Sequence, residues 1–221
     1  MEEKSLSISF GDSLKVEAVA CISDLAEVGL DAIMEDGMLK DIPILSSAVS
    51  LYKIGNNLKE RHHLKKLIVF LDTINQGIVT EKKRTEYQHK FQNNENFRDK
   101  EIEYLLILID RYISNDKPQL LAKFYLAYLD ELINWFEFTV FAETIERFLP
   151  DDIERLFFDF PVQFNFKSVD SAYQRLQAVG LIIELPIQVQ VENEILSLDD
   201  KTKTYDLTDF GKQFVNILQR R

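Results

Sequence analysis

The sequence predicts a mainly α-helical fold, a multi-helix bundle followed by a small C-terminal α+β unit. The chain of 221 residues contains only seven Gly and five Pro, so few residues interrupt long helices. Up to about residue 160 its apolar residues recur at helical spacing, whereas one later segment alternates apolar and polar residues as a strand does. We therefore expect a helical bundle domain over residues 1–160 and an α+β unit over residues 161–221.

The first two helical stretches begin and end at residues that interrupt helices. A helix is expected over residues 13–35, because its apolar residues keep helical spacing and Asp36-Gly37 then stops it. Pro43 opens the next helix, because proline is favoured in the first turn of a helix.

The apolar stripe changes face within this second stretch. Up to residue 58 it covers one broad face, whereas Leu64, Leu67 and Leu71 point to the opposite side. A straight helix would not bury opposite faces in succession against one core. We therefore predict a break or a sharp kink at Gly55-Asn56-Asn57.

The remaining helices of the bundle are joined by short connections. They are expected over residues 80–91, 97–114, 119–133, 135–149 and 150–158. The segment 97–114 is apolar almost all round, which indicates a central position. Asn134, with Glu137 three residues on, is typical of a helix start. Helices in this order with short loops favour a bundle.

The period changes in the last 60 or so residues, which alternate between helix and strand patterns. Residues 168–179 predict a short helix that Gly180 ends. Residues 187–192 alternate like a half-exposed strand, and residues 202–207 are expected to return as its partner. Thr208 then caps a closing amphipathic helix.

Two short motifs in this tail resemble a known unit. Gly180-Leu181-Ile182 at the end of one helix and Leu207-Thr208 with Gly211 at the start of the next are similar to the end of many bacterial winged-helix units. The resemblance covers residues 168–218 and implies a β-wing between the motifs, that is, a winged-helix-like C-terminal unit.

The order of a helical body and this tail is also similar to abortive-infection alpha-type proteins of bacterial phage defence. That second resemblance rests on the same Gly-Leu-Ile and Leu-Thr motifs and on Phe210-Gly211-Lys212 with Phe214. It implies a role in phage defence. The helical body offers no matching motif, so no functional residue is transferred.

The net charge is −11, which opposes general nucleic-acid binding. The charge is uneven, because residues 53–90 carry a local +5 while the rest carries −16. Within this basic island, Lys59, Arg61, His62, Lys65 and Lys66 occupy one arc of a helix, and Lys82, Lys83 and Arg84 form a second cluster. We interpret both as solvated faces, with contact to an anionic partner as the alternative.

No metal site, cofactor or catalytic residue is expected. His62 and His63 are adjacent, so their rings point about 100° apart on a helix and do not converge on one ion. Cys21 is the only cysteine and has no histidine near it in sequence, which favours a buried thiol over a nucleophile. No phosphate-binding loop, nucleophile elbow or zinc-peptidase motif occurs.

The cellular compartment follows from similar exclusions. A single cysteine excludes disulfides within one chain, and the acidic N-terminus differs from a secretory signal. No apolar run reaches the ~18–20 residues of a membrane span. We therefore expect a cytoplasmic protein without a transmembrane segment.

Three functions are compatible with these features of the sequence. The leading expectation is a non-catalytic protein that binds a protein partner or forms a homo-oligomer, with nucleic acid not expected as a ligand because residues 180–207 carry a net −4. The first alternative is a DNA-binding transcriptional regulator that uses the winged helix. The second is a membrane-active effector whose residues 42–70 make peripheral contact with anionic lipid.

Overall fold

The computed structural model describes most of the chain as two compact units, Met1–Phe138 and Thr139–Arg221, here called the N-terminal and C-terminal units. The described residues are 5–15, 18, 22, 41–52, 58–78, 80–93, 95–147, 149–157, 160–165, 171–185 and 202–220. The structure is mainly helical with a small antiparallel sheet near the C-terminus, as predicted. The domain boundary expected at residue 160 stays a prediction.

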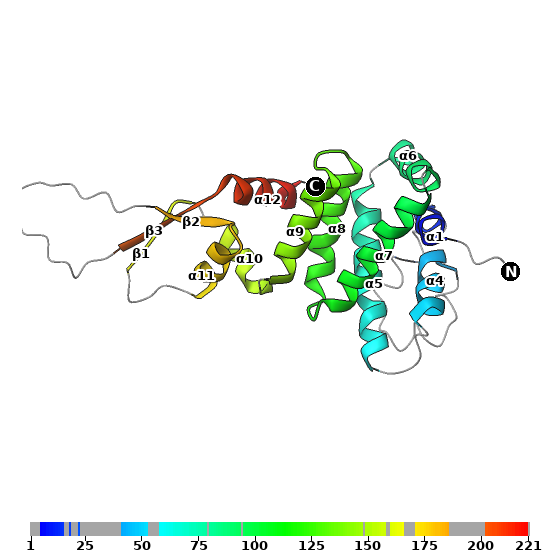
Figure 1. The fold of residues 1–221 in the computed structure, drawn as a ribbon, viewed down its shortest axis with the longest axis horizontal. Coiled ribbons are helices and arrows are strands. Elements are labelled where there is room, and N and C mark those ends of the chain that lie inside the picture. The colour runs from blue at the N-terminus through cyan, green and yellow to red at the C-terminus, as the bar shows by residue number, and fades with distance from the viewer. Residues whose placement is uncertain are drawn as a thin grey trace, which may run out of the picture. The chain divides into compact units, whose positions relative to one another are not determined.

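The N-terminal unit is built entirely of helices in its described part (Figure 1). They are α1 (Leu6–Asp12), α4 (Pro43–Tyr52), α5 (Leu58–Gly77), α6 (Glu81–Gln92), α7 (Glu95–Arg111), α8 (Asp116–Leu129) and the start of α9 (Trp135–Arg147). Helix α5 packs against α7 and α8, and α1 packs against α4, α6 and α7. The expected central position of α7 agrees with its contacts to three helices.

Helix α1 begins before the first helix that the sequence predicted. Ser5 caps it by accepting a hydrogen bond from the Ile8 backbone N–H at 3.3 Å. Its sequence, LSISFGD, alternates apolar and polar residues, so periodicity alone does not indicate a helix there. Most of the helix predicted over residues 13–35, including Cys21, lies outside the described residues.

The change of apolar face between α4 and α5 is confirmed. Ile44, Leu45 and Ala48 of α4 are buried, and so are Leu64 and Leu67 on the opposite angular face of the next helix. Separate helices let both stripes enter one core. The predicted break at residues 55–57 lies outside the described residues.

The centre of the N-terminal unit is a cluster of aromatic rings. Phe10 of α1 lies edge-on to Phe91 of α6, with ring centroids 4.8 Å apart, and to Tyr125 of α8 at 6.0 Å. Phe70 of α5 contacts both Phe10 and Tyr125. These contacts join four helices in one core. Edge-on ring pairs stabilise it beyond the area that they bury.

The C-terminal unit alternates helix and strand. After α9 it contains α10 (Pro150–Leu156), β1 (Val162–Asn165), α11 (Ser171–Ala178), β2 (Ile182–Leu185), β3 (Thr202–Leu207) and α12 (Asp209–Gln219). The strands form an antiparallel sheet in the order β1-β3-β2, with Val162 opposite Tyr205 and Ile182 opposite Leu207.

The sheet agrees only in part with the predicted strands. Strand β3 matches the predicted return strand 202–207, and α12 has the predicted cap at Thr208. The sequence does not predict β1 and β2, because they are four residues each and too short for a clear alternation. The predicted strand 187–192 lies outside the described residues.

Candidate functional site

The basic residues predicted on α5 meet the C-terminal end of α7 in the N-terminal unit. Lys59 is exposed, with its Nζ 3.7 Å from Asp110 Oδ2, and Lys65 is exposed as well. His62 is half-buried, and its Nε2 donates to the Ile113 carbonyl at 2.8 Å. These contacts place one edge of the predicted face against residues 110–113. We call this region, formed by Lys59, His62, Lys66 and residues 110–113, the α5–α7 junction.

Lys66 corrects the prediction of a fully solvated face. Its side chain is only 2% exposed, and its Nζ donates to the carbonyls of Asp110 at 2.8 Å and Tyr112 at 2.5 Å. The last carbonyls of a helix lack partners within the helix and carry partial negative charge, so a cation there is favourable. Burial nevertheless lowers the pKa of Lys66. Lys66 therefore caps α7 from a neighbouring helix.

His63 is the second correction, because this histidine is buried and not solvated. Its side chain is 4% exposed, and Nδ1 lies 3.4 Å from Asp110 Oδ1. Burial lowers the pKa of His63, and Asp110 opposes that effect while Lys66, Lys59 and His62 add to it. His63 is therefore a neutral ring packed beside the buried ammonium of Lys66, which is a structural role.

The second basic cluster, on α6, is paired within the fold. Lys82 Nζ is 3.9 Å from Glu86 Oε1, and Lys83 Nζ donates to Asp130 Oδ2 at 2.7 Å. Arg84 contradicts the predicted solvation, since it is 8% exposed and its Nη1 donates to the Leu14 carbonyl at 2.7 Å. A guanidinium can be buried when carbonyl and amide oxygens satisfy it.

The two basic clusters make their contacts at opposite ends of α8. The α5 cluster contacts Ile113, just before α8 begins, whereas Lys83 contacts Asp130, directly after α8 ends. The 14 residues of α8 span about 20 Å along the helix axis. Contact with an anionic partner therefore stays a prediction for each cluster separately.

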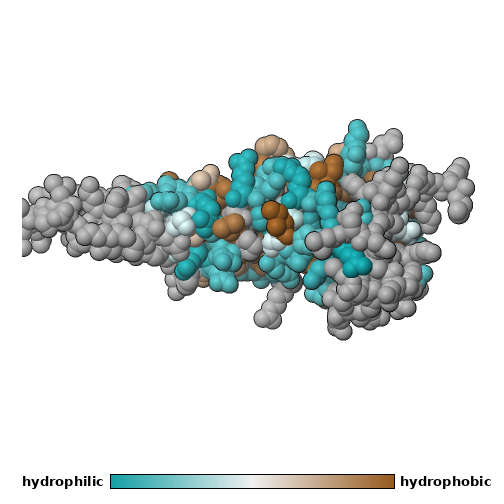
Figure 2. Space-filling view, turned by 90° about the horizontal axis from the view of Figure 1, so that it is seen from below, coloured by the Kyte–Doolittle hydropathy of each residue, from teal (hydrophilic) through white to brown (hydrophobic). Residues whose placement is uncertain are grey.

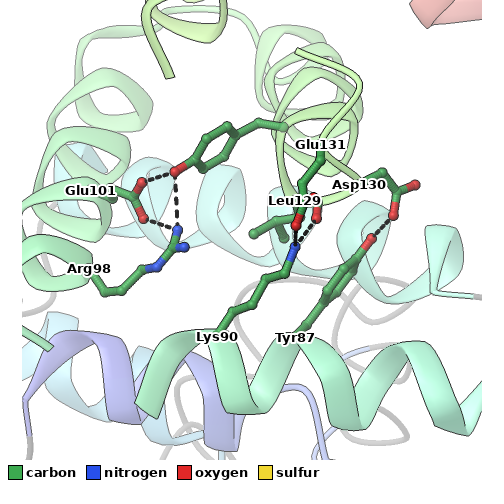
Figure 3. Close-up of polar contacts among 8 residues, drawn as sticks. Tyr87, Lys90, Arg98, Glu101, Leu129, Asp130 and Glu131 are labelled. Carbon is green, nitrogen blue, oxygen red and sulfur yellow. Dashed lines mark hydrogen bonds and ion pairs between the residues drawn. The ribbon is translucent and has the colours of Figure 1, made fainter. Parts of the chain in front are cut away.

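A polar network that the sequence does not predict joins α6, α7 and the end of α8 (Figure 3). Glu101 is buried on α7, accepts from Arg98 Nη1 at 2.6 Å and also accepts from the Tyr128 hydroxyl. Nearby, Lys90 Nζ donates to the Leu129 carbonyl at 2.7 Å and to Glu131. The available signal was a pair of opposite charges at i, i+3 on one helix.

The phenols in this network act as hydrogen-bond donors. Burial and the neighbouring Glu101 raise the pKa of Tyr128 to about 12. Burial and Asp130, which accepts from the Tyr87 hydroxyl, also raise the pKa of Tyr87 well above its ordinary value. Both hydroxyls therefore stay protonated at neutral pH. The arrangement stabilises the packing of α6, α7 and α8 and holds a carboxylate in the interior.

The tail motifs meet in space in the C-terminal unit. Gly180 has a φ of 79°, which glycine tolerates best, and turns the chain after α11. The Thr208 hydroxyl donates to the Gly180 carbonyl at 2.6 Å and accepts from the Gly211 N–H at 2.9 Å. A Cβ on Gly211 would lie 1.9 Å from the Leu181 carbonyl oxygen. The motif thus fastens the start of α12 to the end of α11.

Arg175 and Asp152 form the best-defined ion pair of the C-terminal unit. Arg175 Nε and Nη2 donate to the two oxygens of Asp152 at 2.8 and 2.6 Å. Asp152 is fully buried and also accepts from the Leu149 N–H at the start of α10. Such a two-point pair is among the stronger charge-assisted contacts. It connects α10 with α11.

Among the described residues no group of His, Cys, Asp and Glu is arranged to hold a metal ion. No described helix has both the length and the apolar content needed to cross a membrane. Comparisons with protein-family models, curated proteins and solved structures gave no match for the chain.

Proposed function

We propose that the protein acts by binding a protein partner and not by catalysis, and that its C-terminal unit is a winged-helix-like docking module. The order α10-β1-α11-β2-β3-α12 and the strand order β1-β3-β2 support the winged-helix part of the proposal. In that arrangement α11 occupies the place of the helix that reads DNA in winged-helix regulators.

The ion pair that Arg175 forms with Asp152 favours a protein partner over DNA. A DNA-reading helix presents its cations to phosphates and bases. Arg175 is the only basic residue of α11, and the buried Asp152 already binds it at two points. Releasing it would leave a buried carboxylate unpaired, at a cost of about 3–5 kcal/mol. The charge of Arg175 therefore serves an ion pair within the fold.

Exposed apolar side chains in the same unit support a docking role. Ile183 of β2 is 50% exposed, and Leu149 and Phe157 at the two ends of α10 are exposed as well. On the face that Figure 2 shows, hydrophobic residues form small patches in hydrophilic surroundings. Small apolar patches with a polar rim suit a non-obligate protein contact.

Phage defence is the proposed biological setting, and it rests on the resemblance of the tail to abortive-infection alpha-type proteins. The measurement is plating efficiency of phages on cells that express the full-length protein. We expect protection that Ile183→Glu abolishes, because a charge in the docking patch blocks the partner. Gln177→Glu, an exposed polar position of α11, is the matched control. Equal protection by both variants would contradict docking through β2.

DNA binding by the full-length protein separates this proposal from a regulator. We expect fluorescence anisotropy with a labelled duplex to give a Kd no tighter than about 1 μM at physiological salt, the range of non-specific binding. A nanomolar Kd that Gln174→Glu on α11 weakens would establish the regulator instead.

The membrane-active alternative requires residues 42–70 to leave the core. Most of their described apolar side chains are buried, among them Ile44, Leu45, Leu67 and Phe70. We expect no sedimentation of the protein with vesicles of anionic phospholipid at neutral pH. Co-sedimentation that Lys65→Glu abolishes would support the effector.

A further inference from the structure

Ile113 is the most exposed large apolar side chain that the structure describes. It lies in the connection between α7 and α8 and is 89% exposed. Single exposed apolar residues are common and need no explanation by themselves. The surroundings of Ile113 set it apart, because its backbone is held and its neighbours are cationic.

Side chains of α5 fix the backbone that carries Ile113. Lys66 donates to the carbonyls of Asp110 and Tyr112, and His62 donates to the carbonyl of Ile113 itself. Capping of α7 accounts for the stability of this arrangement. It does not account for the apolar side chain held in solvent. A preordered loop loses less entropy when a partner binds.

The surface around Ile113 is positive on a chain of net charge −11. Lys59 of α5 and Arg111 at the end of α7 are exposed. Lys65 is exposed as well and lies on α5 three residues after His62, which contacts Ile113. Asp110 offsets part of this charge through Lys59, and Asp116 contributes one further carboxylate. The local excess is still positive, which attracts an acidic surface, whereas the net charge of −11 on each chain opposes the approach of a second copy.

We propose that Ile113, together with Lys59 and Arg111 of the α5–α7 junction and the neighbouring Lys65, forms an interaction surface for a protein with an apolar pocket bordered by carboxylates. Ile113 inserts into the pocket, and Lys59, Lys65 and Arg111 face its rim. A buried apolar anchor inside a charged rim is the usual anatomy of such contacts. This surface lies in the N-terminal unit and does not depend on the docking role of the C-terminal unit.

The first experiment places the photo-crosslinking residue benzoylphenylalanine at position 113 of the full-length protein in its host. Position 132 is the control, because Leu132 is exposed at the other end of α8. We expect an adduct from position 113 that position 132 does not give. Absence of an adduct from position 113 would overturn the proposal.

The second experiment measures the affinity of the purified crosslinked protein for variants of this chain. Ile113→Ser should weaken binding about 30-fold, the effect of a central anchor, while Leu132→Ser should leave it unchanged. Lys65→Glu should lower the association rate and reduce the salt dependence of binding. Ile183→Glu, in the C-terminal unit, should leave this affinity unchanged, so that failure of tail docking and failure of this surface are distinguishable.

Three results would overturn the inference. The first is wild-type affinity for Ile113→Ser with an unchanged circular dichroism spectrum, which shows that the side chain is not an anchor. The second is tighter binding by Lys65→Glu, which would indicate a basic partner. The third is concentration-dependent self-association that Ile113→Ser abolishes, which would make the partner a second copy of the chain.

Discussion

Replacement of Gly211 by alanine tests how the C-terminal unit is held together. Gly211 lies in the first turn of α12, and a Cβ there would sit 1.9 Å from the Leu181 carbonyl oxygen. The same oxygen accepts a hydrogen bond from the Thr208 N–H at 3.1 Å. The clash therefore involves backbone that already bonds α12 to the end of α11, and no side-chain rotation relieves it.

Two effects of Gly211→Ala have opposite signs. Alanine favours a helix over glycine by about 1 kcal/mol. Against this, ordinary contact begins near 3.4 Å, so the helix start must move by roughly 1.5 Å. That movement weakens the hydrogen bonds from Thr208 to the carbonyls of Gly180 and Leu181, each worth about 1 kcal/mol. With overpacking of about 2 kcal/mol, we expect a net loss of about 3 kcal/mol.

Gly77→Ala is the matched control, because its clash is with a side chain that can move. A Cβ on Gly77 would lie 2.3 Å from Leu126 Cδ1, the end of a half-buried and rotatable side chain. We expect a change below about 1 kcal/mol.

The assay is urea unfolding followed by circular dichroism, with hydrogen exchange of the α12 amides as a local measure. Faster exchange in α12 of Gly211→Ala should accompany the loss of stability. If Gly211→Ala is as stable as the wild type, or more stable, helix propensity outweighs the contact with Leu181 and the close approach is not a constraint.

Other predictions concern the N-terminal unit. Lys66→Met should lower the free energy of unfolding by about 2 kcal/mol, because two carbonyls at the end of α7 lose their donor. Lys65→Met, the control, should change it by less than about 0.5 kcal/mol. Equal urea midpoints for the two variants would refute the capping of α7 by Lys66. The pKa of His63 is lowered from 6.5 in the folded state, so the unfolded chain binds more protons as the pH falls below 6.5. The contribution of His63 to stability is therefore complete above pH 6.5 and is lost as the pH falls toward its lowered folded-state pKa. His63→Gln should flatten this pH dependence of the free energy of unfolding, measured by urea unfolding at several pH values. Tyr128→Phe should cost about 1–2 kcal/mol by removing a donor to the buried Glu101, and an unchanged melting temperature would contradict that role.

Much of the helical architecture could be predicted because its signals are local. The cap at Thr208, the start of α4 at Pro43 and the change of apolar face before Leu64 each depend on residues within a few positions of one another. The short strands β1 and β2 were missed because four residues give too little alternation to recognise.

The candidate site was only partly predictable, as Lys66 shows. On the helix it shares an exposed arc with Lys59 and Lys65, so its sequence position suggests solvent. The carbonyl of Tyr112, 46 residues away, gives it a buried partner. No local pattern encodes that acceptor, because a free carbonyl at a helix end depends on where the helix ends and on what packs against it.

Local patterns predict the mainly helical class, the small α+β tail, the acidic net charge with its basic island, and the residues that begin and end several helices. These properties follow from periodicity, backbone preference and composition, which act over a few residues. Contacts between distant segments bury Lys66 and Arg84, pair Arg175 with Asp152 and hold the backbone of the exposed Ile113. The reason is electrostatic, since a charge is buried or left in solvent according to the partners that distant segments bring to it.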